Sequence, residues 1–99
     1  MLYRQCDILI QHTDHVPPGA VKLKHLVIAS SDTTGHTHTI KDRASAVLYS
    51  RAGENYLEVI KEFAELVHSE HDTIVLEHGL YRVWRQREYA EQGARNVVD

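Results

Sequence analysis

Turn-forming residues interrupt this 99-residue chain at short intervals, and the segments between them are rich in Val, Ile, Thr, Leu and Tyr. Several of these segments alternate apolar and polar residues, which is the pattern of a strand with one buried face. Turn signals that recur about every 8–12 residues are typical of antiparallel sandwiches and barrels. We therefore expect a mostly β fold, a small antiparallel barrel or sandwich of the jelly-roll or cupin-like kind.

The positions of the expected strands follow from the same pattern. They are residues 4–12, 22–29, 36–40, 46–49, 73–77 and 80–89. Residues 16–20 break the first ladder with two prolines and a glycine, residues 51–55 are typical of a hairpin turn, and residues 78–79 are expected to turn. The segment 56–68 fits either one short helix or two short strands, and the close spacing of turns elsewhere favours strands.

The length predicts one domain over residues 1–99, with a single core and with 90–99 as a loosely ordered tail. Hydrophobic residues make up 42% and charged residues 25%, as in an ordinary globular protein. No apolar run is long enough to cross a bilayer, so we expect no membrane partner. The first residues lack the basic and apolar regions of a secretory signal, which makes the cytoplasm the expected compartment.

Cysteine and charge narrow the kinds of site that the chain can build. Cys6 is the single cysteine, so a thiolate-rich zinc site is excluded and any metal ligands must be nitrogen and oxygen. The net charge of −3 argues against a broad phosphate-binding face, and nucleic acid is an unlikely partner. A small-molecule substrate and a second copy of the chain are the partners that stay open.

Histidine is the residue in which the composition departs from the ordinary. Six of the eight histidines lie in three close pairs, at positions 12 and 15, 36 and 38, and 68 and 71. His36 and His38 project from the same face of a strand, so they can present two imidazoles to one ion. His68 and His71 can converge on a helical turn or across a tight bend, and Glu70 could ligate or orient an imidazole. The sequence therefore predicts a metal site with these four histidines as ligands.

Imidazole ligands, with or without a carboxylate, suit Zn, Fe, Mn, Co, Ni or Cu rather than Ca or Mg. Three protein ligands and an open position would permit catalysis, whereas four in a tetrahedron are typical of a structural site. Both alternatives stay open. His12 and His15 flank the proline loop and are expected to be solvated, and the isolated His25 and His78 are not expected to bind the ion.

The last expected strand is rich in arginine, and neither of its faces is cleanly apolar. A solvated strand in which arginine stems cover aromatic rings accounts for this pattern. A functional alternative places Gln86 and Glu88 beside the metal, where they would orient ligands or transfer protons. Another alternative is that Arg82, Arg85 and Arg87 bind an anion or a single-stranded nucleic acid.

The chain as a whole resembles a group of small, uncharacterised bacterial and phage-borne proteins, and the resemblance covers nearly its full length. The pattern is G-H-x-H at 35–38, H-x-E-H at 68–71 and Y-R-V-x-R-Q-R-E-Y at 81–89. The resemblance implies a β-rich fold and a shared histidine site, without an established activity. The H-x-H element is also similar to that of cupins, but no glutamate follows His38 at the short cupin distance, so the likeness is an analogy only.

These observations favour a small β protein that holds a transition metal in a histidine cluster and is suited to metal-dependent small-molecule chemistry. The alternative is a structural or interaction module without catalysis, in which a metal stabilises the fold or is absent. The third hypothesis is anion or nucleic-acid binding through the arginine-rich strand.

Overall fold

The computed structural model describes residues 2–30 and 35–85, and every regular element in these ranges is a β-strand. The strands are β1 (Leu2–Gln5), β2 (Ile8–Thr13), β3 (Val21–Lys22), β4 (Val27–Ser30), β5 (Thr37–Ile40), β6 (Ala46–Arg51), β7 (Glu54–His68) and β8 (His71–Arg85). The predicted mostly β fold is confirmed. The helical alternative for 56–68 is wrong, because this segment lies within β7. The described residues contain no helix of the length and apolarity that a membrane span requires.

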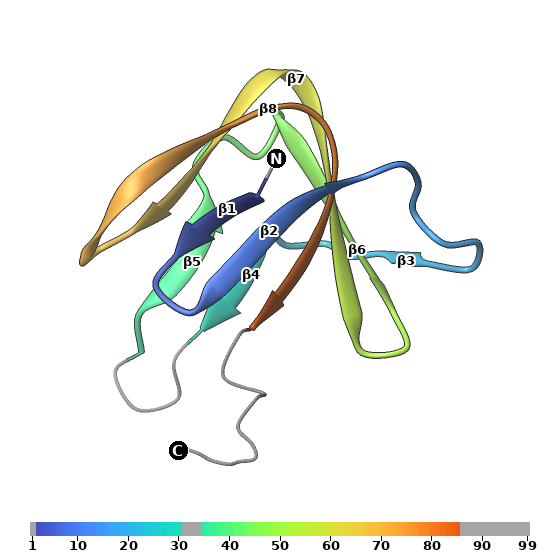
Figure 1. Cartoon of the computed structure of the whole chain (residues 1–99), viewed down its shortest axis with the longest axis horizontal. Coiled ribbons are helices and arrows are strands. Elements are labelled where there is room, and N and C mark those ends of the chain that lie inside the picture. The colour runs from blue at the N-terminus through green and yellow to red at the C-terminus, as the bar shows by residue number, and fades with distance from the viewer. Residues whose placement is uncertain (1, 31–34, 86–99) are drawn as a thin grey trace.

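The strands form one antiparallel sheet that curls into a half-barrel (Figure 1). Its main path runs β1-β2-β8-β7-β5-β4, while β6 joins β7 and β3 off this path. The two longest strands, β7 and β8, pair along most of their length and hold the two halves together. Their register shifts between Val59 and Phe63. Such an irregularity bends a strand pair and strengthens its twist, which lets the sheet curl.

The turn between β6 and β7 shows how local backbone chemistry sets the register of the sheet. Ala52 and Gly53 both have positive φ, 51° and 82°, and they join Arg51 to its partner Glu54. Two consecutive residues with positive φ are characteristic of the tight hairpin turn that matches the twist of the flanking strands. The hairpin turn predicted near 51–55 is therefore confirmed.

Two of the expected strands are each divided in the structure. Residues 4–12 form a hairpin rather than one strand, because Cys6 takes a φ of 57° and the chain reverses so that Gln5 pairs with Ile8. Residues 22–29 contribute to two strands with different partners: β3 pairs with β6, and β4 pairs with β5. An exposed Cys in the left-handed region carries none of the usual sequence signals of a turn.

The turn expected at His78 and Gly79 is absent, because β8 runs through both residues. Gly79 pairs with Val59 and has a φ of 151°, so this glycine lies at an irregular point of a continuous strand. Strand β8 is described as far as Arg85. Residues 86–89 of the predicted last strand and the tail 90–99 lie outside the described residues.

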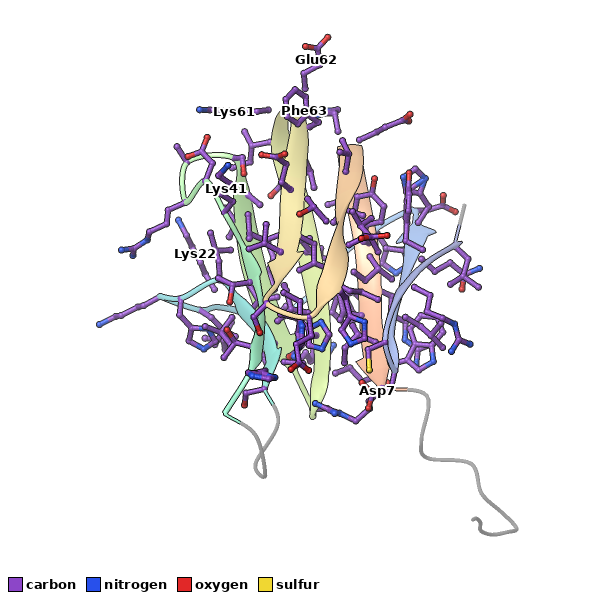
Figure 2. All side chains as sticks on the ribbon, turned by 90° about the vertical axis from the view of Figure 1, so that its left-hand side faces the viewer. Asp7, Lys22, Lys41, Lys61, Glu62 and Phe63 are labelled. Carbon is purple, nitrogen blue, oxygen red and sulfur yellow. The ribbon has the colours of Figure 1, made fainter. Side chains whose placement is uncertain are left out.

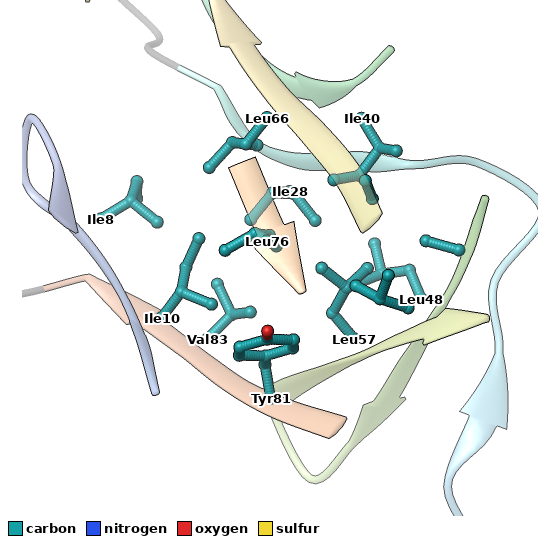
Figure 3. Close-up of a cluster of buried hydrophobic side chains, with 13 residues drawn as sticks. Ile8, Ile10, Ile28, Ile40, Leu48, Leu57, Leu66, Leu76, Tyr81 and Val83 are labelled. Atoms are coloured by element: carbon teal, nitrogen blue, oxygen red, sulfur yellow. The ribbon is translucent and has the colours of Figure 1, made fainter. Parts of the chain in front are cut away.

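The core fills the inside of the curl (Figure 3). Its members are apolar side chains, nearly all from alternating strand positions: Ile8, Ile10, Ile28, Ile40, Ala46, Leu48, Leu57, Val59, Ala64, Leu66, Leu76, Tyr81 and Val83. Tyr81 is the largest fully buried side chain, and its hydroxyl donates a hydrogen bond of 2.6 Å to the Glu77 carbonyl. Burying aromatic area while satisfying the hydroxyl is the favourable way to place a tyrosine in a core.

Phe63 and Asp7 lie at opposite ends of the molecule (Figure 2). Phe63 is 50% exposed, and Figure 2 shows it beside Glu62, pointing away from the sheet. The histidine pairs 36/38 and 68/71 lie elsewhere, where β5 begins and where β7 turns into β8. These strand ends are the elements that position the site.

Candidate functional site

Three neighbouring strands each bring one histidine to the same level of the sheet. The partner of Thr39 is Val67, so the preceding His38 on β5 lies next to His68 on β7. His68 in turn pairs directly with His71 on β8. Because the strands lie about 4.8 Å apart, side chains at one level of adjacent strands are within contact distance. The hairpin register therefore forms a row of imidazoles across the sheet.

With His36, which directly precedes β5, these residues make up the histidine cluster: His36, His38, His68 and His71. The ring centroids of His68 lie 4.4 Å from His38, 4.6 Å from His71 and 5.5 Å from His36, and those of His38 and His71 lie 6.4 Å apart. The structure thus brings together the four histidines that the sequence singled out, with His68 at the centre. Their role as metal ligands stays a prediction.

The imidazoles are close, but their nitrogens are not arranged around a common point. Within residues 2–30 and 35–85, no group of three His, Cys, Asp or Glu side chains is placed to hold a metal ion. A ligand shell would therefore require at least one ring of the cluster to turn. The hydrogen bonds of each ring show which ones are already oriented.

His38 is oriented by Gln5, which reaches it from the end of β1. The Gln5 amide nitrogen donates to the carbonyls of Leu66 at 3.0 Å and Asp72 at 2.9 Å. Its oxygen lies 2.7 Å from Nδ1 of His38. Gln5 is only 3% exposed and His38 5%, so this network is inside the protein. One side chain thus ties β1 to β5, β7 and β8.

These contacts determine the tautomer of His38. Both amide protons of Gln5 go to carbonyls, so the group that faces His38 is the amide oxygen, which can only accept. Nδ1 of His38 must therefore carry a proton and donate it. In the neutral ring this leaves the lone pair on Nε2. A hydrogen bond from Nδ1–H to a carbonyl oxygen is the usual way in which proteins orient a histidine that binds metal through Nε2.

The surroundings also keep His38 neutral. Burial, followed by repulsion from His68, lowers the pKa of His38 from 6.5 to about 4. Asp7 opposes this shift and Arg85 adds to it. Asp7 and Arg85 form an ion pair of 2.9 Å with each other, so their effects on the pKa of His38 partly cancel. Desolvation also lowers the pKa of His68, together with the nearby His71 and His36.

His68 is oriented differently from His38. Its Nδ1 accepts a hydrogen bond of 3.0 Å from the backbone N–H of Glu70 in the β7–β8 turn. A neutral His68 in this arrangement carries its proton on Nε2, so neither nitrogen offers a lone pair to an ion. The Glu70 carboxylate lies 3.4 Å from Nδ1 of His36 and is exposed. Glu70 therefore contacts the cluster twice, through its backbone and through its side chain.

The other histidines make contacts that do not involve the cluster. His12 packs on Tyr81 with ring centroids 4.4 Å apart, Nδ1 of His25 accepts from the N–H of Val27, and Nδ1 of His78 lies 3.1 Å from the Ile60 carbonyl. These three histidines were not expected to be ligands, and no interaction of theirs reaches the cluster. His15 is exposed, as predicted.

The arginine-rich strand shows the expected alternation, with Tyr81 and Val83 buried and Arg82 exposed. Arg82 lies over the ring of Trp84 at 5.0 Å and 3.4 Å from the Glu54 carboxylate. The predicted cover of aromatic rings by arginine is thus found at this pair. Gln86, Arg87 and Glu88, the remaining candidates on this strand, lie outside the described residues.

Sequence reasoning missed Gln5 as part of the site. It is a single glutamine in an amphipathic strand, separated by 33 residues from His38 and by 61 from Leu66. No local pattern carries such a relation. Gln5 is recognised only from its burial in the structure, because a buried amide requires hydrogen-bond partners.

Comparison with known proteins adds a family and no function. No curated protein and no solved structure matches the chain. Residues 4–86 match a family described as a domain of unknown function, DUF8820. The matched span contains Gln5 and all four residues of the histidine cluster. This protein therefore belongs to the DUF8820 family.

Proposed function

We propose that this protein binds one transition-metal ion in the histidine cluster. The observation that supports the proposal best is the contact between Gln5 and His38. It buries an amide and an imidazole together and leaves the Nε2 lone pair of His38 as the available donor.

The proposal requires His68 to turn. Coordination through Nε2 would place the ring proton of His68 on Nδ1, where it would point at the backbone N–H of Glu70 and the hydrogen bond between them would be lost. Giving up one exposed hydrogen bond costs about 1 kcal/mol. Metal binding in small structural sites is worth about 10 kcal/mol or more, so this cost is minor. The turn lies at the tip of the β7–β8 hairpin, where only residues 69 and 70 link the strands.

The ligand chemistry limits the ion. Neutral imidazoles suit Zn, Fe, Mn, Co, Ni or Cu, and the single cysteine excludes a thiolate shell. The cluster joins β5, β7 and β8, so a bound ion would also stabilise the fold, as expected for the structural alternative. The further proposal of metal-dependent small-molecule chemistry depends on this binding step. The proposal of a cytoplasmic location depends on the composition.

The contacts of the arginine-rich strand do not favour anion or nucleic-acid binding there. Arg85 donates to the Asp7 carboxylate at 2.9 Å and to the Ser30 carbonyl at 3.1 Å. Arg82 pairs with Glu54. A guanidinium that already has a carboxylate partner attracts a phosphate less strongly, because the two charges nearly cancel.

Elemental analysis of protein purified without an affinity tag tests the proposal. We expect about one equivalent of a transition metal after incubation with metal and desalting. The double substitution of His38 and His68 by alanine should abolish retention, whereas the matched double substitution of the exposed His15 and His25 should leave it unchanged. Less than about a tenth of an equivalent in the wild-type protein, or equal retention by both double variants, would refute metal binding at the cluster.

A further inference from the structure

A gap in the sheet separates β5 from β6. Both strands pair with β7, but β6 pairs with its first part, residues 54–59, whereas β5 pairs with residues 66–67 near its end. Between these two parts the register of β7 against β8 shifts, and such a shift bends a strand pair. The residues 22–26 cross the opening that this arrangement leaves, and we call them the crossing segment.

Backbone hydrogen bonds hold the crossing segment between the two strands. The N–H of Leu23 donates to the Leu48 carbonyl of β6 at 2.8 Å, and the Leu26 carbonyl accepts from the N–H of Ile40 of β5 at 3.1 Å. A hollow of about 520 Å³ opens beside the crossing segment. Pockets that bind small organic molecules have volumes of about 300–1,000 Å³, so this hollow is large enough for one.

Much of the lining of the hollow is apolar. Because the hollow lies at a gap in the sheet, it reaches residues of the core as well as exposed ones. The apolar residues with large side chains that line it are Leu23, Leu26, Val47, Leu48 and Ile60. Leu48 belongs to the core, whereas Ile60 is 49% exposed. A ligand with an apolar part would remove this exposed surface from water, which favours binding.

Three exposed cationic side chains also line the hollow, those of Lys22, Lys24 and Arg43, and none of its described lining residues is a carboxylate. Arg43 donates to the Lys24 carbonyl at 3.5 Å, which keeps its guanidinium against the crossing segment. The ion pairs within residues 2–30 and 35–85 involve none of these three cations. Asp42, the acidic neighbour of Arg43, is paired with Lys61 at 3.0 Å instead. The hollow therefore has a positive charge that the described part of the chain leaves unpaired.

This positive charge is concentrated on one side of a protein whose net charge is −3. The four lysines of the chain all lie on or next to the segments that line the hollow: Lys22, Lys24, Lys41 and Lys61. Figure 2 shows Lys22 and Lys41 on the same side of the molecule. A local excess of one charge beside a concave surface raises the concentration of ligands of the opposite charge there.

We infer that this hollow binds an amphipathic anion, a carboxylate or phosphate group attached to an apolar chain. The anionic group lies among Lys22, Lys24 and Arg43, where charge-assisted hydrogen bonds hold it. The apolar chain covers Ile60 and the apolar lining. An inorganic anion would leave that lining in water, and a neutral apolar molecule would leave the three cations unpaired. None of the four histidines of the cluster lines the hollow, so the inference is independent of metal binding.

Sodium octanoate and octyl phosphate are the probes, each used below its critical micelle concentration. They are titrated separately into isotope-labelled protein that has been treated with chelator and desalted, and amide NMR spectra report where they bind. We expect saturable shift changes centred on residues 22–26 and 43–48 with at least one probe, and the tighter one identifies the anionic group. Sodium acetate, inorganic phosphate and octan-1-ol each carry only one half of a probe and should bind at least about tenfold more weakly.

The double variant Lys24→Gln/Arg43→Gln should weaken binding of the tighter probe about tenfold, because two of the three cationic contacts are lost. The matched control Arg4→Gln/Arg51→Gln removes the same charge at exposed positions that do not line the hollow, and it should leave the affinity unchanged. No saturable shift changes with either probe, or changes centred on other residues, would overturn the inference. Equal affinity for the tighter probe and for one of its halves, or an equal loss in both double variants, would overturn it as well.

Discussion

Replacing Gln5 by leucine tests the network that orients His38. The substitution keeps the approximate volume but removes three hydrogen bonds, of 2.7, 2.9 and 3.0 Å. It leaves Nδ1–H of His38 and the carbonyls of Leu66 and Asp72 without their partner. Each buried polar group that loses its partner costs about 1–3 kcal/mol, and one of the three bonds is only partly buried. We therefore expect a loss of roughly 3–5 kcal/mol in the free energy of unfolding.

Urea unfolding of metal-free protein measures this loss, with Gln11→Leu as the control. Gln11 lies on the adjacent strand of the same hairpin and is exposed, so its substitution should change stability by less than about 0.5 kcal/mol. The loss expected for Gln5 is large for a domain whose total stability is about 5–15 kcal/mol. If Gln5→Leu matched the control within 0.5 kcal/mol or so, the network would not hold the site, and the reasoning on the His38 tautomer would be refuted.

Three further predictions concern pH, the core and a turn. Folding lowers the pKa of His38 from 6.5 to about 4, so protonation of this ring favours the unfolded state. The contribution of His38 to the free energy of unfolding is therefore complete above pH 6.5 and falls by about 3 kcal/mol as the pH drops toward 4. Acid titration of stability in the presence of chelator should show this loss in wild type and much less of it in His38→Gln. Tyr81→Phe removes the 2.6 Å bond to the Glu77 carbonyl and should cost about 1–2 kcal/mol in urea unfolding, and no change would mean that this hydroxyl is not held there. Ala52→Gly should raise the thermal midpoint, because a φ of 51° costs alanine about 1 kcal/mol, and a lower midpoint would contradict the assigned turn.

Sequence reasoning was most successful where a local pattern and the fold agree. The turn at Ala52 and Gly53 and strand β5 were identified because β-branched residues and a glycine stand where the structure needs them. The segment 56–68 remained ambiguous, because its apolar residues satisfy both helical and strand periodicity. The long pairing with β6, β5 and β8 decides it, and such pairing is not visible in a single segment.

The errors arose where conformation departs from residue preference. Cys6 turns the chain in a conformation that is uncommon for cysteine, and Gly79 was expected to turn the chain but lies within a strand. At the site, the i, i+2 spacing identified His36 and His38, and the short 68–71 spacing identified the facing pair. Gln5 could not be found in this way, since its partners are brought to it only by the curl of the sheet.

The central claim is that the histidine cluster holds a transition metal, and anomalous scattering from crystals grown with zinc tests it most directly. We expect one strong peak about 2.0–2.1 Å from Nε2 of His38 and from nitrogens of at least two other cluster histidines, with His68 turned away from the Glu70 N–H. An anomalous map without a peak at the cluster, in crystals whose His68 still accepts from Glu70, would contradict the claim.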